Sequence, residues 1–275
     1  MNNVIYPKTL NCPELEMYVG NKEVHLLRYF EPEPGLFIAE TKNVIDVALR
    51  RGYEVYSVVC SEKMLSDELL TRIGDAPIYV VDLDEAKKQF GYVLTGEISA
   101  VMRRKAPADY REVLRGAKRI VVLEDVENPT NVGAIFRSAA AFGIDGIILS
   151  PACVDPLYRR AMRVSVGNVF NIPWAYACFN EAEWEQKGIA LLKEEGFTTV
   201  AMALREDNVM IDDPALKAAE KLAIIMGNEG NGLVDATIAA CDYVAKIPME
   251  NGVDSLNVAV ASALAMWELR NDKQA

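Results

Sequence analysis

The feature that most constrains this chain is a regular alternation of apolar and helical segments through its second half. Apolar runs rich in β-branched residues recur and are separated by stretches with helical periodicity. We predict strands at IVVLEDV, Gly146–Leu149, Val169–Pro173, Thr198–Ala203, Leu222–Met226 and Tyr243–Ile247. The helices between them are predicted at Val132–Phe142, Glu181–Glu195 and Asn257–Arg270. This alternation predicts an α/β fold with a mostly parallel sheet covered on both faces.

A smaller alternation of the same kind occupies the first third of the chain. We predict strands at LFIAE, EVYSVVC, PIYVVD and Ile98–Met102, with helices at Lys42–Arg51, Lys63–Ile73 and Asp84–Phe90. Proline and glutamate interrupt the residues before Leu36, and a charged stretch containing Pro107 separates the two series. The predicted organisation is an N-terminal extension (1–35), a small α/β domain (36–105), a linker (106–118) and a larger α/β domain (119–275).

Composition excludes several classes of protein. With 275 residues, 51% of them hydrophobic and 25% charged, the chain can bury a core and is neither disordered nor fibrous. No uncharged apolar run reaches the roughly 18 residues of a membrane span. The N-terminus lacks the basic and then apolar order of a secretory signal. We therefore expect a soluble protein of the cytoplasm.

The cysteines and the histidine argue against a metal site. Five cysteines, an odd number, are widely spaced without a CxxC pair, which disfavours a disulfide framework or a zinc site and fits a reducing compartment. The single histidine, His25, has no second histidine with which to share a metal ion. We expect His25 to be a surface or packing residue and predict no metal.

The net charge of −11 argues against a nucleic-acid partner, because neutralising phosphates requires cations. The charges are unevenly distributed, however. Between Arg103 and Arg119, seven basic side chains face two acidic ones, and Arg159, Arg160 and Arg163 form a second basic cluster. Each cluster has two interpretations, a contact with RNA or a solvated helix face. The local sequence leaves both open.

Three loops at the ends of predicted strands carry the candidate chemistry, since parallel α/β sheets bind ligands there. The first, Asn128–Arg137, leads from IVVLEDV into an alanine-rich helix. Asn131 can cap that helix, and Gly133 permits close approach of the backbone. Arg137 requires an anionic partner if it points inward. The alternative is an arginine that reaches solvent or forms a structural ion pair.

The second loop lies within Ile224–Leu233, where a strand runs into Gly227, Gly230 and Gly232. Glycines of this kind present backbone N–H and C=O groups to a ligand without obstruction by Cβ. The pattern is neither the dinucleotide fingerprint GxGxxG nor a phosphate-binding P-loop. Glu229 disfavours phosphate and suits a positively charged ligand. A plain glycine turn is the alternative.

The third loop lies within Lys246–Leu269 and joins a strand to the last predicted helix. Ser255 or Asn257 can cap this helix, and the apolar Ile247, Met249 and Leu256 lie close to its start. Ordinary capping and core packing would account for the same residues.

In order and spacing, these segments closely resemble the signature motifs of the SpoU, or TrmH-type, family of RNA ribose 2′-O-methyltransferases. Here they read NVGAIFRSAAAFG, IIMGNEGNGL and IPMENGVDSLNVAVASALA, and the resemblance covers Arg119 to Leu269. Asp155–Phe170 is similar to the family's segment between its first two motifs. The LFIAETKNV opening resembles, more weakly, the family's ribosomal-protein-like substrate-binding domain.

The resemblance implies a C-terminal part threaded into a trefoil knot, S-adenosylmethionine as cofactor, and a homodimer formed through the knotted domain. Carried over residue by residue, it implies cofactor contacts at Leu204, Gly227, Ile247, Met249 and Leu256.

It also implies catalytic-site positions at Asn131, Arg137, Glu229, Ser255 and Asn257, of which Arg137 matches the family's catalytic arginine. A guanidinium stays charged at physiological pH, so it serves poorly as a simple base. We assign Arg137 chiefly to gripping the neighbouring phosphate and stabilising the developing 2′-oxyanion. Proton removal assisted by that phosphate is the family's usual proposal.

The implied partner is structured RNA, contacted at Arg103, Arg104, Lys105, Arg159 and Arg163. The small N-terminal domain favours ribosomal RNA, with transfer RNA as the alternative. A non-catalytic RNA-binding protein that retains the cofactor pocket is a rival from another class. A nucleotide-binding oxidoreductase is disfavoured by the absence of GxGxxG.

Overall fold

The computed structural model describes residues 3–19, 35–177, 180–205, 208–252 and 254–271, so the prediction for His25 lies outside the described residues. The chain divides into two compact units. Unit 1 comprises Met1–Pro107 and Leu157–Asn171, and unit 2 comprises Ala108–Pro156 and Ile172–Ala275. After Pro156 the chain thus passes from unit 2 into unit 1, where it forms the short segment 157–171, and it re-enters unit 2 at Ile172.

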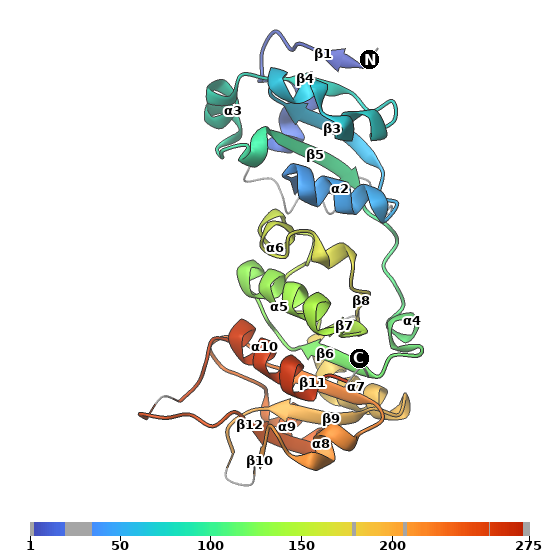
Figure 1. The fold of residues 1–275 in the computed structure, drawn as a ribbon, viewed down its shortest axis with the longest axis vertical. Helices are drawn as coiled ribbons and strands as arrows, with labels where there is room; N and C mark the ends of the chain where they lie inside the picture. The colour runs from blue at the N-terminus through green and yellow to red at the C-terminus, as the bar shows by residue number, and fades with distance from the viewer. Residues whose placement is uncertain (1–2, 20–34, 178–179, 206–207, 253, 272–275) are drawn as a thin grey trace. The chain divides into compact units, whose positions relative to one another are not determined.

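Unit 1 is built on a mixed sheet of order β1-β4-β3-β5-β2, in which β5 runs antiparallel to β2 and β3 (Figure 1). Its strands are β1 (Val4–Ile5), β2 (Leu36–Glu40), β3 (Val55–Cys60), β4 (Ile78–Val80) and β5 (Ile98–Arg103). Its helices from the first part of the chain are η1 (Pro13–Tyr18), α2 (Lys42–Arg50), η2 (Glu62–Ser66), η3 (Glu68–Arg72), α3 (Leu83–Phe90) and η4 (Thr95–Glu97).

The single helix predicted over Lys63–Ile73 is wrong, because the chain forms the two short 3₁₀ helices η2 and η3 there. Asp67 separates them. Its backbone is extended and its side chain accepts a hydrogen bond from Leu69 N at 2.9 Å, which caps η3 and interrupts a continuous helix.

The N-terminal segment contributes directly to the core of unit 1. Strand β1 pairs in parallel with β4, and η1 supplies the buried side chains of Leu15, Met17 and Tyr18. The Tyr18 hydroxyl lies 2.8 Å from Ser57 Oγ, so this buried polar pair is satisfied. Part of the region predicted as an extension is therefore integral to the unit.

The segment 157–171 is held to unit 1 by charge and by aromatic packing. Arg159 and Arg163, on α6 (Arg159–Val164), each lie 3.2 Å from the buried carboxylate of Glu40. Phe170, in η5 (Asn168–Phe170), packs against the rings of Phe37 and Tyr53 at centroid distances of 5.8 and 5.0 Å.

The strand predicted at Val169–Pro173 is therefore wrong. Val169 and Phe170 are buried in unit 1 as part of a 3₁₀ turn, and Ile172 already belongs to unit 2. The next strand of unit 2 is instead β8 (Trp174–Tyr176).

Unit 2 is a seven-stranded parallel sheet of order β10-β12-β9-β11-β6-β7-β8, as the alternation predicted. The other strands are β6 (Arg119–Leu123), β7 (Gly146–Leu149), β9 (Thr198–Met202), β10 (Val209–Met210), β11 (Leu222–Met226) and β12 (Tyr243–Lys246). The helices are α4 (Tyr110–Leu114), α5 (Pro129–Phe142), α7 (Glu181–Glu194), α8 (Pro214–Ala218), α9 (Asp235–Ala240) and α10 (Val258–Leu269).

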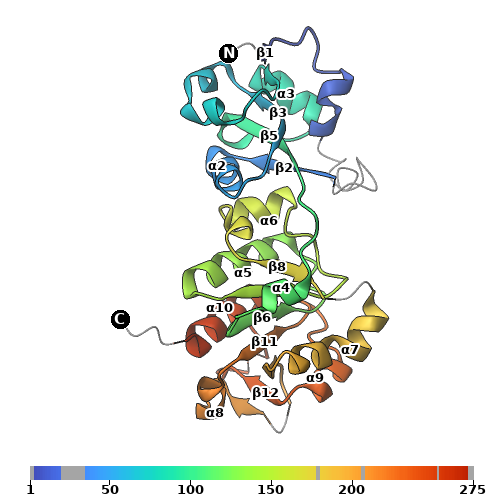
Figure 2. The same cartoon turned by 90° about the vertical axis from the view of Figure 1, so that its right-hand side faces the viewer.

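Helices cover both faces of this sheet, with α5 and α10 packed together on one face (Figure 2). On the other face, Ile120, Val122 and Ile225 form a buried cluster with residues of α4, α7 and α9. Because side chains alternate along a strand, Val121 and Ile224 point to the face of α5 and α10. Within the described ranges, no helix is long and apolar enough to cross a membrane.

We predict that Glu40→Ala lowers the free energy of unfolding by about 3 kcal/mol, as expected when one partner of a buried ion pair is removed. Urea unfolding followed by circular dichroism measures this change. Glu54→Ala is the matched control. The Glu54 side chain is 80% exposed and lies 3.9 Å from Arg103, so its loss should change stability by no more than about 0.5 kcal/mol. Equal losses in the two variants would contradict the structural role of Glu40.

Candidate functional site

The three motif loops meet at the carboxyl edge of the parallel sheet of unit 2. Strand β11 lies between β6 and β9, and Met226 is paired with Leu123. Strand β12 lies on the other side of β9, with Ala245 paired with Met202. The loops that follow these strands consequently begin at one edge, where ligands bind in parallel α/β folds.

The loop after β11 is a tight turn organised by Asn228. The backbone N–H and C=O groups of Asn228 and Gly232 exchange two hydrogen bonds of 3.0 Å. The Asn228 side chain accepts hydrogen bonds from Gly230 N at 2.8 Å and Asn231 N at 3.1 Å, and donates to Asp125 O at 2.7 Å. Asn228 therefore fixes the shape of the glycine loop and ties it to the end of β6.

Gly227 is required by this turn, whereas Gly230 is not. A Cβ at Gly227 would lie 2.3 Å from the carbonyl carbon of Gly232 and 2.4 Å from Leu233 N, which are backbone atoms that cannot move aside. A Cβ at Gly230 would meet only Asn228 Oδ1, at 3.5 Å, an ordinary contact. The glycine at position 227 lets two backbone segments touch.

A chain of hydrogen bonds joins the three motifs. Glu229 Oε1 accepts from Asn131 Nδ2 at 2.9 Å, and Asn131 Oδ1 accepts from Asn257 Nδ2 at 3.2 Å. Glu229 also accepts from the backbone N–H groups of Asn128 at 3.1 Å and Glu127 at 3.4 Å. Glu229 thus connects the second motif to the first, and Asn131 connects the first to the third.

Two helix starts belong to this arrangement. Asn257 caps α10 by accepting from Ala259 N at 3.0 Å, which confirms it as one of the two predicted caps. The prediction of Asn131 as the cap of α5 is wrong. The helix begins earlier, at Pro129, and Asn128 caps it by accepting from Thr130 N at 2.9 Å. Asn131 lies in the first turn, where its side chain reaches Glu229 and Asn257.

The groups around Glu229 change the pKa of its carboxyl group. Partial burial alone would raise the pKa of this carboxyl. Hydrogen bonds from Asn131 and from backbone N–H groups outweigh burial and lower the pKa of Glu229 below its ordinary value. The carboxylate is therefore held ionised as a structural acceptor.

A second carboxylate, that of Glu124, was not predicted from the sequence and holds the segments next to the glycine loop. Glu124, 1% exposed, accepts from Trp184 Nε1 at 2.7 Å, from Val234 N at 2.9 Å and from the Thr237 hydroxyl. It joins the end of β6 to α7 and to the start of α9. A carboxylate directly after a buried strand is the signal that would have identified it.

The remaining predicted cofactor residues lie in the loops after β9 and β12. Ile247, Met249 and Leu256 are half-buried, and Leu204 is 51% exposed. Ser255 is exposed beside Leu256. These four apolar side chains, together with backbone at Gly227, give the edge an apolar part next to its polar hydrogen-bond chain.

Arg137 lies on the exposed side of α5, six residues after Asn131. Its side chain makes no hydrogen bond or ion pair with any described residue. At about 100° and 1.5 Å per residue, its side chain leaves the helix some 120° around and 9 Å along from that of Asn131. Of the two interpretations of Arg137, the structure therefore supports a side chain that reaches solvent, and its guanidinium is available to a ligand.

In unit 1 the predicted RNA-binding residues all have protein contacts. Arg103 lies over the Tyr56 ring at 5.1 Å, Arg104 Nε donates to Leu36 O at 3.1 Å, and Lys105 Nζ donates to Arg51 O at 2.6 Å. Arg159 and Arg163 share the buried Glu40. The side chain of Arg159 is only 16% exposed, whereas those of Arg163 and Arg103 are 45% and 49% exposed.

Comparison with known proteins identifies the family. Residues 118–267 match the SpoU rRNA methylase family. An uncharacterised tRNA/rRNA methyltransferase of Mycobacterium bovis is 35% identical over 236 residues, which are 85% of this chain and 80% of that protein. The chain belongs to the SpoU rRNA methylase family. It is thus a member of a family of RNA methyltransferases.

Further relatives agree with this assignment. A protein of Staphylococcus aureus named as a TrmH-family tRNA/rRNA methyltransferase is 29% identical over 83% of this chain and 93% of its own. The crystal structure of an AdoMet-bound rRNA methyltransferase from Sinorhizobium meliloti matches with a TM-score of 0.83 at 23% identity. The match covers 99% of this chain and 100% of that one, and it shows a shared fold.

The lowered pKa of Glu229 generates a prediction about acid stability. The pKa of Glu229 is lower in the folded than in the unfolded protein, so its carboxylate stabilises the fold at pH values above the ordinary pKa of about 4.3. This stabilisation is lost as the pH falls through the pKa of the folded state. The stability deficit of Glu229→Gln should be greatest at neutral pH and shrink below about pH 4. Urea unfolding at pH 7, 5, 4 and 3 measures it. Glu185→Gln, at an exposed position of α7, should differ little from wild type at pH 7. A Glu229→Gln deficit that did not vary with pH would contradict the assignment.

Proposed function

We propose that this chain is a cytoplasmic S-adenosylmethionine-dependent enzyme that methylates a ribose 2′-hydroxyl of structured ribosomal RNA. The observation that carries the proposal is the hydrogen-bond chain from Glu229 through Asn131 to Asn257, which joins all three family motifs at one sheet edge. Residues far apart in sequence are held together where parallel sheets bind ligands. Transfer RNA is the alternative substrate, because the relatives are named as tRNA/rRNA methyltransferases.

The residues at this edge fit the proposed cofactor. Asn208 Nδ2 donates to Ala203 O at 2.7 Å, but Asn208 Oδ1 is buried and accepts no hydrogen bond from the described residues. A buried acceptor of this kind suits an amino group such as that of adenine. Ile247, Met249 and Leu256 would supply apolar contact, and the turn closed by Gly227 would present backbone groups.

S-adenosylmethionine supplies a methyl group bonded to a positively charged sulfur. The chain's residues have two tasks, to hold the loops in place and to prepare the attacking oxygen. Asn131, Glu229 and Asn257 perform the first through their hydrogen bonds, and the exposed Ser255 precedes Asn257 in the third motif. Arg137 performs the second. Its planar guanidinium would grip the adjacent phosphate and stabilise negative charge on the 2′-oxygen, while the phosphate assists removal of the proton.

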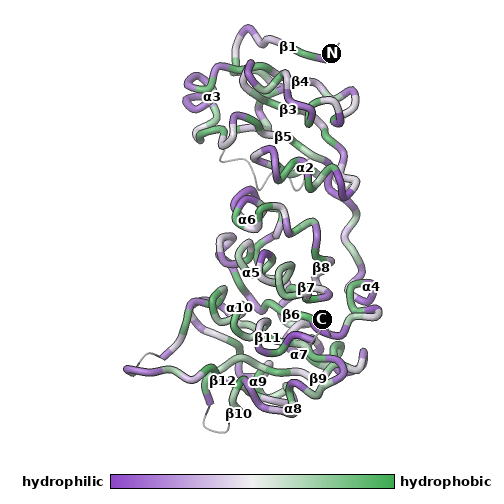
Figure 3. Tube along the Cα trace, in the orientation of Figure 1, coloured by the Kyte–Doolittle hydropathy of each residue, from purple (hydrophilic) through white to green (hydrophobic). Residues whose placement is uncertain are grey.

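We further propose a homodimer formed through α10 and the end of α5. Helix α10 is apolar around most of its surface (Figure 3). Its inner face packs on α5, while Val260, Leu264 and Trp267 are 50%, 42% and 52% exposed. Spacings of four and three residues place these side chains on one outer stripe. Phe142 of α5 continues it, with its ring 5.6 Å from that of Trp267. A contiguous exposed apolar patch of this kind indicates a protein interface.

The trefoil knot of the C-terminal part is also part of the proposal. Two features support it. Helix α10, the last helix, packs against α5, the helix after the first strand of the sheet. Strand β11 inserts between the earlier strands β6 and β9. Neither arrangement results from stacking successive elements side by side.

We predict that Arg137→Ala binds S-adenosylmethionine as tightly as wild type but transfers methyl groups about a hundredfold more slowly or worse, the usual loss when a charge-stabilising group is removed. Calorimetry measures binding. Transfer of labelled methyl onto ribosomal particles or tRNA from a strain lacking the protein measures activity, and alkali-resistant linkages identify 2′-O products. A variant with wild-type turnover would remove Arg137 from the mechanism.

The paired glycines provide the controls for the binding step. Gly227→Ala should lose binding of S-adenosylmethionine, because its Cβ would displace the backbone of Gly232 and Leu233. Gly230→Ala should keep it, because that position has room for a methyl group. Wild-type protein that failed to bind S-adenosylmethionine at millimolar concentration would overturn the proposed function. Binding without transfer to any RNA would favour the non-catalytic alternative.

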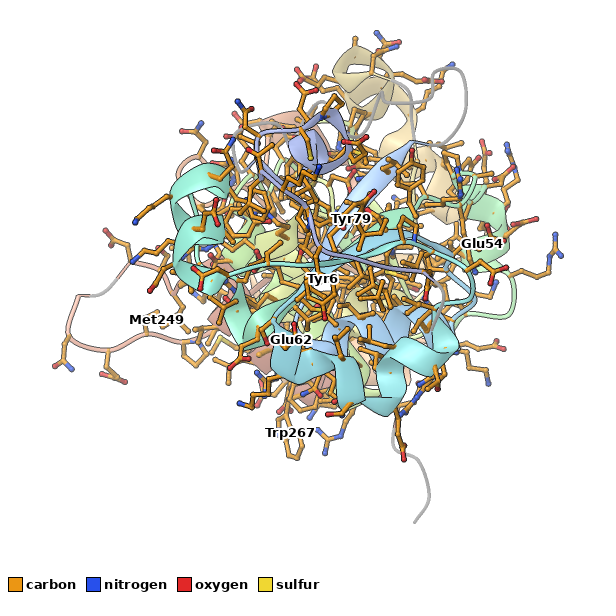
Figure 4. The ribbon with its side chains drawn as sticks, turned by 90° about the horizontal axis from the view of Figure 1, so that it is seen from above. Tyr6, Glu54, Glu62, Tyr79, Met249 and Trp267 are labelled. Carbon is orange, nitrogen blue, oxygen red and sulfur yellow. The ribbon has the colours of Figure 1, made fainter. Side chains whose placement is uncertain are left out.

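We also predict that the full chain sediments as a dimer and that Trp267→Glu sediments as a monomer. A charge placed on the apolar stripe would have to be buried without a partner. The Trp267 side chain projects outward from unit 2 (Figure 4). Wild-type protein that sediments as a monomer at micromolar concentration would contradict the proposed interface.

A further inference from the structure

Unit 1 contains a cavity of about 590 Å³ between η1, the beginning of β3 and the turn before β4. Its lining includes Glu14, Met17, Tyr56, Tyr79 and Arg103. The volume falls in the range that holds small ligands, about 300–1,000 Å³. The mixture of aromatic rings, one guanidinium and one carboxylate differs from the purely apolar lining of an ordinary packing defect.

A break in the sheet directs Tyr56 toward this cavity. The β3–β5 pairing shifts register between Val55 and Ser57, since Val55 pairs with Met102 and Ser57 with Val101. Tyr56 is therefore the extra residue of a β-bulge. Bulges re-aim side chains and occur frequently beside functional sites. Behind it, the buried Ser57 hydroxyl is held by Tyr18 at 2.8 Å, which fixes this part of the strand.

Tyr56 and Arg103 together form a platform suited to a flat aromatic ligand. The Arg103 guanidinium lies 5.1 Å from the centroid of the Tyr56 ring. Unstacked RNA bases bind on tyrosine rings and on guanidinium planes of this kind. The Arg103 side chain is 49% exposed, and Glu54 lies 3.9 Å from it with 80% exposure, so that ion pair is weak enough to yield to a phosphate.

The remaining lining groups complete the chemistry. Tyr79, 8% exposed, forms a deep aromatic wall. Burial and the nearby Glu14 carboxylate raise the pKa of the Tyr79 phenol, which therefore remains a neutral hydrogen-bond donor. Glu14 is exposed at the rim and is an acceptor when ionised. Carboxylates accept hydrogen bonds from exocyclic amino groups of bases, such as cytosine N4.

We propose that this cavity receives one unpaired nucleobase of the RNA substrate, stacked at Tyr56 and Arg103, with Glu14 favouring a base that carries an amino group. The inference rests on the proposed function in that the ligand is taken to be part of the RNA. A small multiply charged anion fits less well, because the Glu14 carboxylate also lines the cavity and Glu54 lies 3.9 Å from the Arg103 guanidinium. A base-paired nucleotide does not fit, because its base remains stacked inside the RNA helix. Only an unpaired base that has left the helix can enter a cavity.

The test measures RNA binding by the full chain at low salt without any methyl donor. Fluorescence anisotropy compares single-stranded heptamers of cytidine and of uridine with a blunt twelve-base-pair RNA duplex. Tyr56→Leu keeps apolar volume but removes the ring, and we expect about tenfold weaker binding of the cytidine heptamer with unchanged duplex binding. Tyr56→Phe should bind as wild type. We expect wild type to prefer cytidine to uridine, and Glu14→Gln to remove that preference.

Tyr6→Leu is the matched control. Tyr6 is an exposed tyrosine of the same unit, 61% accessible and hydrogen-bonded to Glu62 at 2.9 Å; both residues are labelled in Figure 4. It is not among the described residues that line the cavity. It should bind every probe as wild type does. An equal loss in Tyr6→Leu and Tyr56→Leu would overturn the proposal, because it would indicate general surface binding.

Two further outcomes decide the matter. Undiminished cytidine binding by folded Tyr56→Leu, or no binding of either heptamer by wild type, overturns the proposal. If Tyr56→Leu does not fold, wild-type protein is tested with a heptamer that carries 2-aminopurine at its centre. Stacking of this base on the Tyr56 ring should quench its fluorescence. Absence of quenching overturns the proposal. Since no donor is present, these results are independent of S-adenosylmethionine binding and methyl transfer, on which the proposed function depends.

Discussion

The parallel register of four strands is the constraint on which the rest of unit 2 depends. Leu123 is paired with Met226, and Met202 with Ala245, so the residues after each pair emerge at the same edge. Glu124 and Gly227 then stand next to one another in adjacent loops. Both strands are buried along their whole length, and a shift of one residue in the β6–β11 pairing would change the face on which residues such as Val121 and Ile224 pack. The close packing on both faces therefore fixes the register. Burial of the strands therefore sets the geometry of the site.

Two carboxylates convert this shared edge into a fixed arrangement of loops. Glu124 is buried and satisfied by three donors, and it holds the start of α9 against the end of β6. Glu229 is at the surface and ties the second motif to the first. Both bind backbone N–H groups, which lack freedom to move away, so each contact restrains a whole segment. The glycine loop is held by hydrogen bonds within it, by the bond of Asn228 to Asp125 and by the bonds of Glu229 to the first motif.

The sequence predicted the parallel sheet of unit 2 because buried parallel strands are continuous apolar runs, which is the strongest local signal available. It also identified Asn131, Glu229 and Asn257, but not that they bond to one another. Glu124 was missed because its partners Trp184, Val234 and Thr237 are distant in sequence. Arg159 and Arg163 show the same difficulty. No local pattern reveals that Glu40, about 120 residues earlier, supplies their buried partner.

The 3₁₀ segments were mispredicted for related physical reasons. Val169 and Phe170 are apolar enough for a strand, but Phe170 is buried against Phe37 and Tyr53 of unit 1 rather than in the sheet of unit 2. An apolar run reports that a segment is buried and does not report in which core. Because the segment 157–171 interrupts unit 2, the two units are joined at three points of the chain rather than by a single linker. A strand assignment that assumed sequential domains could not anticipate this.

The acidic net charge of −11 is compatible with an RNA substrate because charges act locally. At physiological ionic strength the screening length is about 8 Å, so a phosphate near Arg103 responds mainly to the groups around that side chain. Those groups include Glu54 at 3.9 Å, which competes for the same guanidinium. A phosphate displaces an exposed carboxylate at small free-energy cost, since exposed ion pairs are worth less than about 1 kcal/mol. Arg159 differs, because its carboxylate partner, Glu40, is buried. If Arg159 moved to a phosphate, the buried Glu40 charge would lose this partner at a much larger free-energy cost. The physical distinction between Arg103 and Arg159 is therefore the burial of these carboxylates, since Glu54 is exposed and Glu40 is buried.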